Sequence, residues 1–206
     1  MRRGEFEVTD QEEILRFLEE ESFGFLSAAR PDGRPGITPL NFVYTAGAVY
    51  FHGSRIGDKM DSIRLNPHVA FAVAREYAII PSYFTDPNMA CPATSWFKSV
   101  VITGRIEVVE DAGEKAAALG ALMRKLQPEG GYDPIRPDDP RYAPRLKGVA
   151  VLKLVPESVT AKFKFGQNLA DAQRADIAAR LRERGLKLDR ETAELMERYG
   201  PREPKP

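Results

Sequence analysis

Closely spaced β-prone segments joined by short turns are the feature that most limits how this chain can fold. Residues 23–29, 37–44 and 48–52 are rich in aromatic and β-branched side chains. The turn sequence Pro-Asp-Gly-Arg at residues 31–34 separates the first two segments, and residues 45–47 separate the second from the third. Turns this short join antiparallel neighbours, because parallel strands need a crossover of about a dozen residues or more. We therefore predict an antiparallel meander.

The rest of the chain alternates further strands with a few helices. The later strands are predicted at residues 69–74, 96–109, 149–155 and 159–165. Helical spacing predicts helices at residues 59–65 and 112–125, and an opening amphipathic helix after the capping-box sequence at residues 9–12. Strands that outnumber helices in this way favour an antiparallel β-barrel with peripheral helices, because closure removes exposed sheet edges.

Two segments depart from this pattern. Residues 76–93 lose the strand period and gather prolines, which predicts an irregular excursion. From Ala170 onward, the pattern predicts two short charged helices broken at Gly185. The last six residues, 201–206, are rich in proline and charge, which predicts disorder.

Composition excludes several functional classes. Lys and Arg total 30, as do Asp and Glu, so no net field attracts nucleic acid or an anionic membrane. Cys91 is the only cysteine, which excludes an intramolecular disulfide and a cysteine-caged metal within one chain. The N-terminus lacks the unbroken apolar run of a secretory signal, and no segment has the roughly 20 apolar residues that span a bilayer. We expect a cytoplasmic protein that binds a small molecule, with no metal, nucleic acid or membrane partner.

Residues 50–59 are the most informative stretch for chemistry. A predicted strand leads into a turn that contains Gly53 and Gly57, and a helix is predicted to follow. The hydroxyl of Ser54, the cations of Arg55 and Lys59 and the free N–H groups of a helix start can converge on a phosphate. The alternative, in which the glycines only turn the chain and both cations are solvated, stays open at this point.

Several motifs occur in a familiar order along the chain. They are FLSA at residues 25–28, DGRP at 32–35, PLNFVY at 39–44, YFHG at 50–53, GDK at 57–59 and KSVVITG at 98–104. Their order resembles the nitroimidazole-resistance branch of the pyridoxamine 5'-phosphate oxidase-like, FMN-binding split barrels, over residues 12–162. The resemblance implies an antiparallel split β-barrel, mainly β with peripheral helices. We expect this cofactor-binding domain at residues 1–165, followed by a C-terminal extension of two short helices at residues 166–206.

The resemblance also implies a cofactor and the residues that hold it. It implies a homodimer with FMN at the subunit interface, the phosphate contacting Ser54 and Lys59, with Arg55 as a further candidate. The residues that it places along the flavin are Pro39, Leu40, Asn41, Phe42, Phe51, His52 and Gly53, with Ser99, Val100 and Lys162 approaching from later strands. Residues 78–93 and the tail helices are additions to the family pattern.

The resemblance favours one function but leaves alternatives. The leading hypothesis is a flavoprotein oxidoreductase that reduces a nitroaromatic or quinone with a nicotinamide donor. No Rossmann-type glycine motif follows a strand, so the donor would bind transiently. Alternatives are a non-catalytic flavin-binding or flavin-sensing protein, a deazaflavin protein, and a haem-binding split barrel with His52 as ligand. His52 packs against the cofactor in one interpretation and is a catalytic residue, orienting substrate or donating a proton, in the other.

Overall fold

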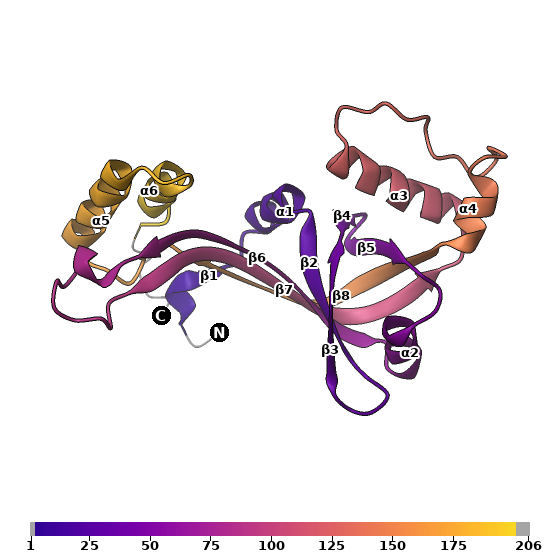
Figure 1. Ribbon diagram of the computed structural model, residues 1–206, viewed down its shortest axis with the longest axis horizontal. Helices are drawn as coiled ribbons and strands as arrows, with labels where there is room; N and C mark the ends of the chain where they lie inside the picture. The colour runs from indigo at the N-terminus through magenta and orange to yellow at the C-terminus, as the bar shows by residue number, and fades with distance from the viewer. Residues whose placement is uncertain (1–2, 201–206) are drawn as a thin grey trace. The chain divides into compact units, whose positions relative to one another are not determined.

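A computed structural model describes residues 3–200 of the chain (Figure 1). The strands are β1 (Glu7–Val8), β2 (Phe23–Ala29), β3 (Pro35–Asn41), β4 (Val43–Thr45), β5 (Ala48–Gly53), β6 (His68–Ile80), β7 (Thr94–Val109) and β8 (Ala150–Lys164). The α-helices are α1 (Gln11–Glu20), α2 (Asp58–Leu65), α3 (Ala112–Leu126), α4 (Ala143–Gly148), α5 (Asp171–Arg184) and α6 (Asp189–Arg198), and short 3-10 helices lie at Gly4–Phe6 and Ser82–Phe84. The predicted disorder of residues 201–206 concerns a segment outside the described residues.

The strands form one 8-stranded sheet with the order β3-β2-β6-β7-β8-β5-β4, and β1 pairs with β8. The ladders with assigned registers are antiparallel. The predicted fold class, a mainly β antiparallel split barrel with peripheral helices, is therefore confirmed. Within residues 3–200 the strand path is open, with β3 and β4 at its ends, so the complete closure expected from the strand count is not found.

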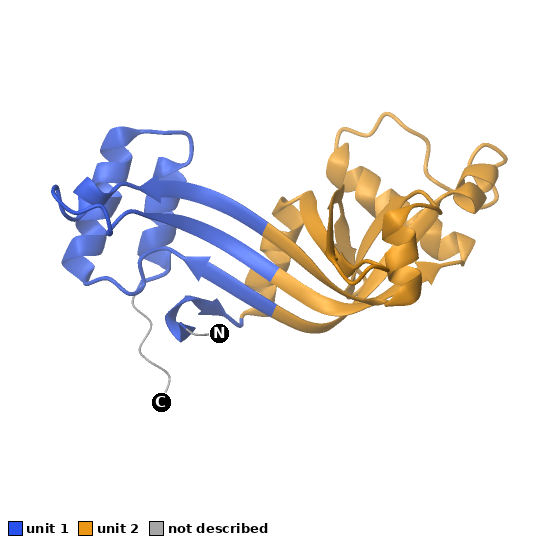
Figure 2. Cartoon of the chain, turned by 60° about the horizontal axis from the view of Figure 1, so that its bottom comes forward, with its two compact units in different colours: residues 1–9, 74–100, 160–206 blue, residues 10–73, 101–159 orange. Residues whose placement is uncertain are grey.

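The chain divides into two compact units, which are coloured separately in Figure 2. Unit 2 comprises residues 10–73 and 101–159. Unit 1 comprises the described parts of residues 1–9, 74–100 and 160–206, and so contains both C-terminal helices. The predicted division between a barrel domain and a helical extension at residue 165 stays a prediction.

Helix α1 closes one side of the unit 2 core. Its N-cap is Asp10, whose side-chain oxygen accepts a hydrogen bond from the N–H of Glu12 at 3.0 Å. The predicted capping box placed the cap one residue earlier, at Thr9; a carboxylate at residue 10 is the better acceptor at a helix N-terminus, where the macrodipole favours negative charge. The helix buries Phe17 and Leu18, as its apolar spacing predicts.

Three strand predictions were wrong in their extent. The predicted strand at residues 37–44 divides into β3 and β4 at Phe42, whose ring is fully buried against Phe71 with centroids 5.0 Å apart. Strand β6 continues to Ile80, through residues predicted to be irregular. Strand β8 continues through Pro156, where a break was predicted. Gly104 permits a close approach of β7 to β8, since a Cβ there would lie 2.0 Å from the backbone oxygen of Val155.

An ion pair fixes the turn between α5 and α6 in unit 1. Gly185 ends α5 in the left-handed conformation with φ of 67°, which confirms the predicted helix break. Arg184, the last residue of α5, and Asp189, the first residue of α6, form an ion pair across this break, with Arg184 Nη2 2.6 Å from Asp189 Oδ1. Arg184 Nη1 also donates to the carbonyl of Ile79 at 2.8 Å, which ties the helical pair to the end of β6. Among residues 3–200, no helix is both long enough and apolar enough to cross a membrane.

Candidate functional site

The predicted phosphate loop forms a small cradle at the end of β5. We call Gly53, Ser54, Gly57 and Lys59 the glycine cradle. The Lys59 side chain folds back over Gly53, so that its Nζ lies 2.7 Å from where a Cβ of residue 53 would stand. A Cβ at residue 53 would stand closer to this ammonium group than van der Waals contact allows, so the ammonium would have to shift. The absence of a Cβ at Gly53 therefore decides where the charge of Lys59 lies.

The Lys59 ammonium is partly desolvated. It lies 5.6 Å from the centroid of the buried Phe51 ring, and burial lowers the pKa of Lys59 below its ordinary value. Among residues 3–200, no carboxylate or hydrogen-bond acceptor is paired with this ammonium group. A partly buried cation without a counter-ion favours an anionic ligand, because a bound anion restores the electrostatic stabilisation that water no longer gives.

Helix α2 begins beside the cradle without a side-chain cap. Its N-cap is Gly57, with φ of 106°, and Asp58 is the first helical residue, one residue before the predicted start at residue 59. Helices α1 and α3, by contrast, are capped by aspartates. The first N–H groups of α2 are thus left for solvent or a ligand. Because Asp58 adds a negative charge to this turn, we expect an anion here to depend chiefly on Lys59.

The side chains of Ser54 and Arg55 already bind other groups of the protein. Ser54 Oγ accepts a hydrogen bond from the N–H of Ile56 at 3.2 Å, which shapes the loop and leaves the hydroxyl free to donate. The Arg55 guanidinium donates from Nη1 to the carbonyl of Lys147 at 3.1 Å and lies 3.7 Å from the Glu110 carboxylate. Contact between Arg55 and the flavin phosphate stays a prediction.

The residues predicted along the flavin ring fall into an exposed group and a buried group. On β3, Pro39 and Asn41 are exposed, and Asn41 Nδ2 donates to the carbonyl of Ser22 at 3.0 Å. His52 is exposed at the end of β5. Three others were predicted beside the cofactor but have wholly or partly buried side chains, so a ligand would meet them mainly through the backbone: Leu40, Phe42 and Phe51.

The remaining predicted residues lie in unit 1. Ser99 Oγ donates to the carbonyl of Lys162 at 3.5 Å, so the structure brings these two residues together. The Lys162 ammonium lies 5.5 Å from the Phe6 ring centroid and 5.4 Å from that of Phe97. Val100 is fully buried. The predicted site residues therefore form two groups, one in each unit.

Sequence reasoning missed a lysine that contacts one of the predicted residues. Lys125 Nζ lies 4.1 Å from the Phe42 ring centroid and donates to the carbonyl of Leu18, near the end of α1, at 2.7 Å. Burial lowers the pKa of Lys125 to about 8, although Glu21 and Glu19 act in the opposite direction. In sequence, Lys125 is an ordinary basic residue in the last turn of a helix, and nothing in the local pattern distinguishes it.

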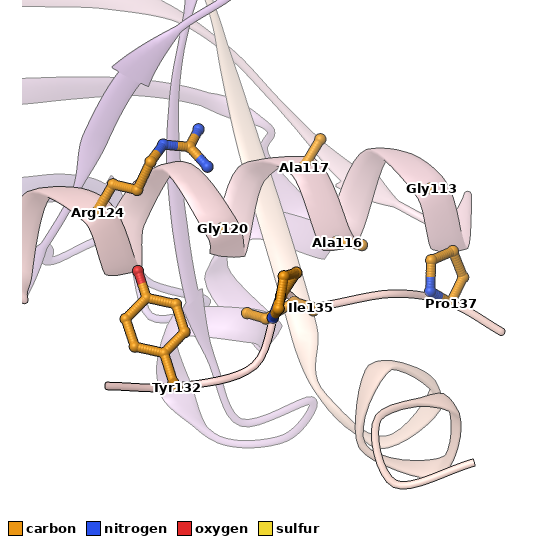
Figure 3. Close-up of a pocket in the computed structure, with 9 residues that line it drawn as sticks. Gly113, Ala116, Ala117, Gly120, Arg124, Tyr132, Ile135 and Pro137 are labelled. Carbon is orange, nitrogen blue, oxygen red and sulfur yellow. The ribbon is translucent and has the colours of Figure 1, made fainter. Parts of the chain in front are cut away.

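Two hollows on unit 2 were also not predicted. One, of about 600 Å³, lies between small residues of α3 and the following connection, which contributes Tyr132, Ile135 and Pro137 (Figure 3). The other, of about 520 Å³, is lined by Arg55 and by residues of α3 and α4. The two hollows share Pro137 as a lining residue.

Comparisons with known proteins agree with this architecture. A family model described as pyridoxamine 5'-phosphate oxidase matches residues 10–163. A comparison with curated protein sequences gives no significant match. Several solved structures are also similar. Their sequence identities to this chain are low, so the similarity supports the fold.

Three of these solved structures share 20–23% of their residues with this chain. A candidate 5-nitroimidazole antibiotic resistance protein from Bacteroides thetaiotaomicron is 22% identical with a TM-score of 0.60, covering 76% of this chain and 85% of its own. The flavocytochrome Anf3 from Azotobacter vinelandii is 23% identical with a TM-score of 0.63, and the match covers 77% of this chain and 69% of the flavocytochrome. The FAD and haem binding protein from Mycobacterium smegmatis is 20% identical with a TM-score of 0.65, and the match covers 84% of this chain and 79% of that protein.

Proposed function

Because the chain belongs to the pyridoxamine 5'-phosphate oxidase family, we propose that it is a flavoprotein that binds FMN at the glycine cradle. The observation that carries this proposal is the unpaired, partly desolvated ammonium of Lys59, held over the bare backbone of Gly53. FMN supplies a phosphate dianion for this position, and its flavin ring supplies electron-transfer chemistry when bound. The names of two structurally similar proteins, a flavocytochrome and an FAD and haem binding protein, support a flavin as the cofactor class.

We propose a homodimer on the basis of an unpartnered apolar sheet face. The register pairs Phe25 with Pro39 and Ser27 with Ile37, which places these side chains on one face of β2 and β3 together with Phe23. Phe23 is 49% exposed, Phe25 45% and Ile37 66%. Contiguous exposed apolar residues of this kind mark an interaction surface. A second copy is the occupant that the family resemblance implies, with the flavin at the interface.

We propose that the bound flavin serves an oxidoreductase reaction on a small acceptor such as a nitroaromatic or quinone. The exposed His52 is the catalytic candidate, because its imidazole has no protein partner among the described residues and stands one residue before Gly53. From there it can orient an acceptor or donate a proton. The expected effect of His52→Ala is a lower rate of acceptor reduction with FMN affinity retained.

A titration with two flavins tests the proposal. Removal of one charge-assisted hydrogen bond costs about 1.5–3 kcal/mol, so Lys59→Ala is expected to weaken FMN binding about tenfold to a hundredfold. Riboflavin, which has no phosphate, is expected to bind both proteins with similar affinity. Lys187→Ala, which removes an exposed lysine in unit 1, is the control and is expected to leave both affinities unchanged. Equal losses for FMN and riboflavin in Lys59→Ala would contradict the proposal.

Haem is the second candidate, favoured by the exposed imidazole of His52 and by the two similar proteins whose names include a cytochrome or haem. The absorption spectrum of the purified protein separates the two. Flavin bands that persist in His52→Ala support the flavin proposal. A ligand-bound Soret band that disappears in His52→Ala would replace it with haem binding.

A further inference from the structure

A buried cation lies at the wall of the 520 Å³ hollow that α3 and α4 line, which we call the α3–α4 hollow. This cation is Lys115 of α3, which is only 3% exposed. Its ammonium donates to the carbonyls of Leu146 at 3.1 Å and Val149 at 3.3 Å, at the end of α4. An ammonium group has three donors, so one is left without an acceptor among residues 3–200. No carboxylate among the same residues pairs with Lys115, so its buried charge has no counter-ion.

Two exposed cations complete the charged part of the lining. Arg55 Nη1 donates to the carbonyl of Lys147 at 3.1 Å, which joins the loop after β5 to α4, and Arg55 Nη2 lies 3.7 Å from the Glu110 carboxylate. The Lys147 ammonium has no partner in the part of the chain that the structure describes. Glu110 is the one acidic residue of the lining, against three basic ones. The α3–α4 hollow thus has an excess of positive charge, in a protein whose formal net charge is zero.

The rest of the α3–α4 hollow is apolar. Its remaining lining residues are Ala112, Pro137, Ala143 and Leu146. The volume of about 520 Å³ lies within the range of small-molecule pockets. A site with cations on one side and aliphatic side chains on the other suits a compact ligand with an anionic group and an apolar body.

The α3–α4 hollow is separate from the glycine cradle. Successive side chains of a strand point to opposite faces of the sheet. On β5, the Tyr50 hydroxyl donates to Glu114 of α3, whereas the ring of the next residue, Phe51, lies 5.6 Å from the Lys59 ammonium. Helix α3 and the hollow therefore belong to the Tyr50 face, and the cradle belongs to the Phe51 face. An anion in the hollow is a second ligand, bound independently of any cofactor at Lys59.

We propose that the α3–α4 hollow binds a small organic phosphate monoester. Such a group carries a charge of about −1.5 to −2 near pH 7, which the excess of positive charge in the lining can compensate. The planar guanidinium of Arg55 presents donors in the geometry that phosphate oxygens accept, and the free ammonium of Lys147 supplies a further donor. Lys115 contributes its uncompensated charge from the wall. The organic body of the ester covers the aliphatic side chains.

The test is a calorimetric titration of the full chain at pH 7.5 with phenyl phosphate and with inorganic phosphate. The reference protein carries Lys59→Ala, which removes the cation of the glycine cradle. Phenyl phosphate is expected to bind at least about fivefold more tightly than inorganic phosphate, because its ring covers apolar surface. Adding Arg55→Met and Lys147→Met, at two exposed positions, is expected to weaken phenyl phosphate about tenfold to a hundredfold. The control pair, Arg34→Met with Lys187→Met, removes the same charge from exposed positions elsewhere and is expected to leave the affinity unchanged.

Three outcomes would overturn the inference. If the Lys59→Ala protein binds no phenyl phosphate, the α3–α4 hollow is not a phosphate site. If inorganic phosphate binds as tightly as phenyl phosphate, the hollow holds an adventitious ion only. If the control pair weakens binding as much as the Arg55 and Lys147 pair, the effect comes from overall charge and not from this site. Each of these results leaves the proposed flavin site untouched, since that site is tested by the FMN and riboflavin titrations.

Discussion

Gly53→Ala tests the glycine cradle with the smallest possible change. The added Cβ would stand 2.7 Å from Lys59 Nζ, whereas ordinary van der Waals contact begins near 3.4 Å. The ammonium must therefore retreat by about 0.7 Å or more, which it can do at little cost because it ends a flexible side chain. A hydrogen bond of 2.8 Å that is stretched this far loses most of its energy. We expect FMN to bind about three- to tenfold more weakly, less than the loss in Lys59→Ala.

Stability is expected to respond differently from affinity. Gly53 does not have a positive φ, so alanine fits its backbone conformation, and the substitution lowers the conformational entropy of the unfolded chain. Thermal unfolding should therefore occur at an equal or slightly higher temperature. Gly4→Ala, where no atom lies within 4 Å, is the neutral control, whereas Gly104→Ala forces a Cβ against backbone and is expected to destabilise the protein. Unchanged FMN affinity in a stably folded Gly53→Ala protein would refute the cradle.

Two further predictions concern buried charges. Asp189→Asn leaves the 21% exposed side chain of Arg184 without its counter-ion. We expect the free energy of unfolding, measured with urea, to fall by close to the lower end of the roughly 3–5 kcal/mol seen when a buried pair is broken. Asp176→Asn, in an exposed pair with Arg180, should change stability little, and equal effects of the two substitutions would contradict the reasoning. For Lys125, the folded pKa of about 8 lies below the ordinary lysine value of 10.5. Between these values the unfolded chain binds more protons, so the contribution of Lys125 to the free energy of unfolding rises with pH. Wild type should therefore gain stability relative to Lys125→Met from pH 8 to 10, and a pH-independent difference would exclude this.

Local signals were sufficient for the short turns and for helix α3, but not for the order of the strands in the sheet, because the strand path places β3 and β4 at opposite ends. The turn at residues 31–34 forms as its Pro-Asp-Gly-Arg sequence predicts, with Gly33 at φ of 81° and the N–H of Arg30 donating to the carbonyl of Arg34 at 2.8 Å. Helix α3 agrees with its predicted span to one residue. These elements follow rules that operate within a few residues, which is why a single sequence predicts them.

The errors arose where distant residues decide the local structure. Residues 76–80 remain in strand β6 because Tyr77, Ala78 and Ile80 are buried, although nearby prolines suggested a loop. The contact of Lys125 with Phe42 joins residues far apart in the sequence, and no periodic pattern reveals it. The cradle was predicted in composition but not in geometry, since the position of Lys59 depends on the buried Phe51 beneath it.

The position of the cradle is set by an interaction on the strand that carries it. Tyr50, on β5, donates from its hydroxyl to Glu114 Oε1 at 2.8 Å, and Lys153, on β8, donates to the same oxygen at 3.1 Å. Burial and the bond to Glu114 raise the pKa of Tyr50, and the bonds from Tyr50 and Lys153 lower the pKa of Glu114, so the three groups keep these charge states at neutral pH. Helix α3 thereby holds β5 and β8 in register just before Gly53.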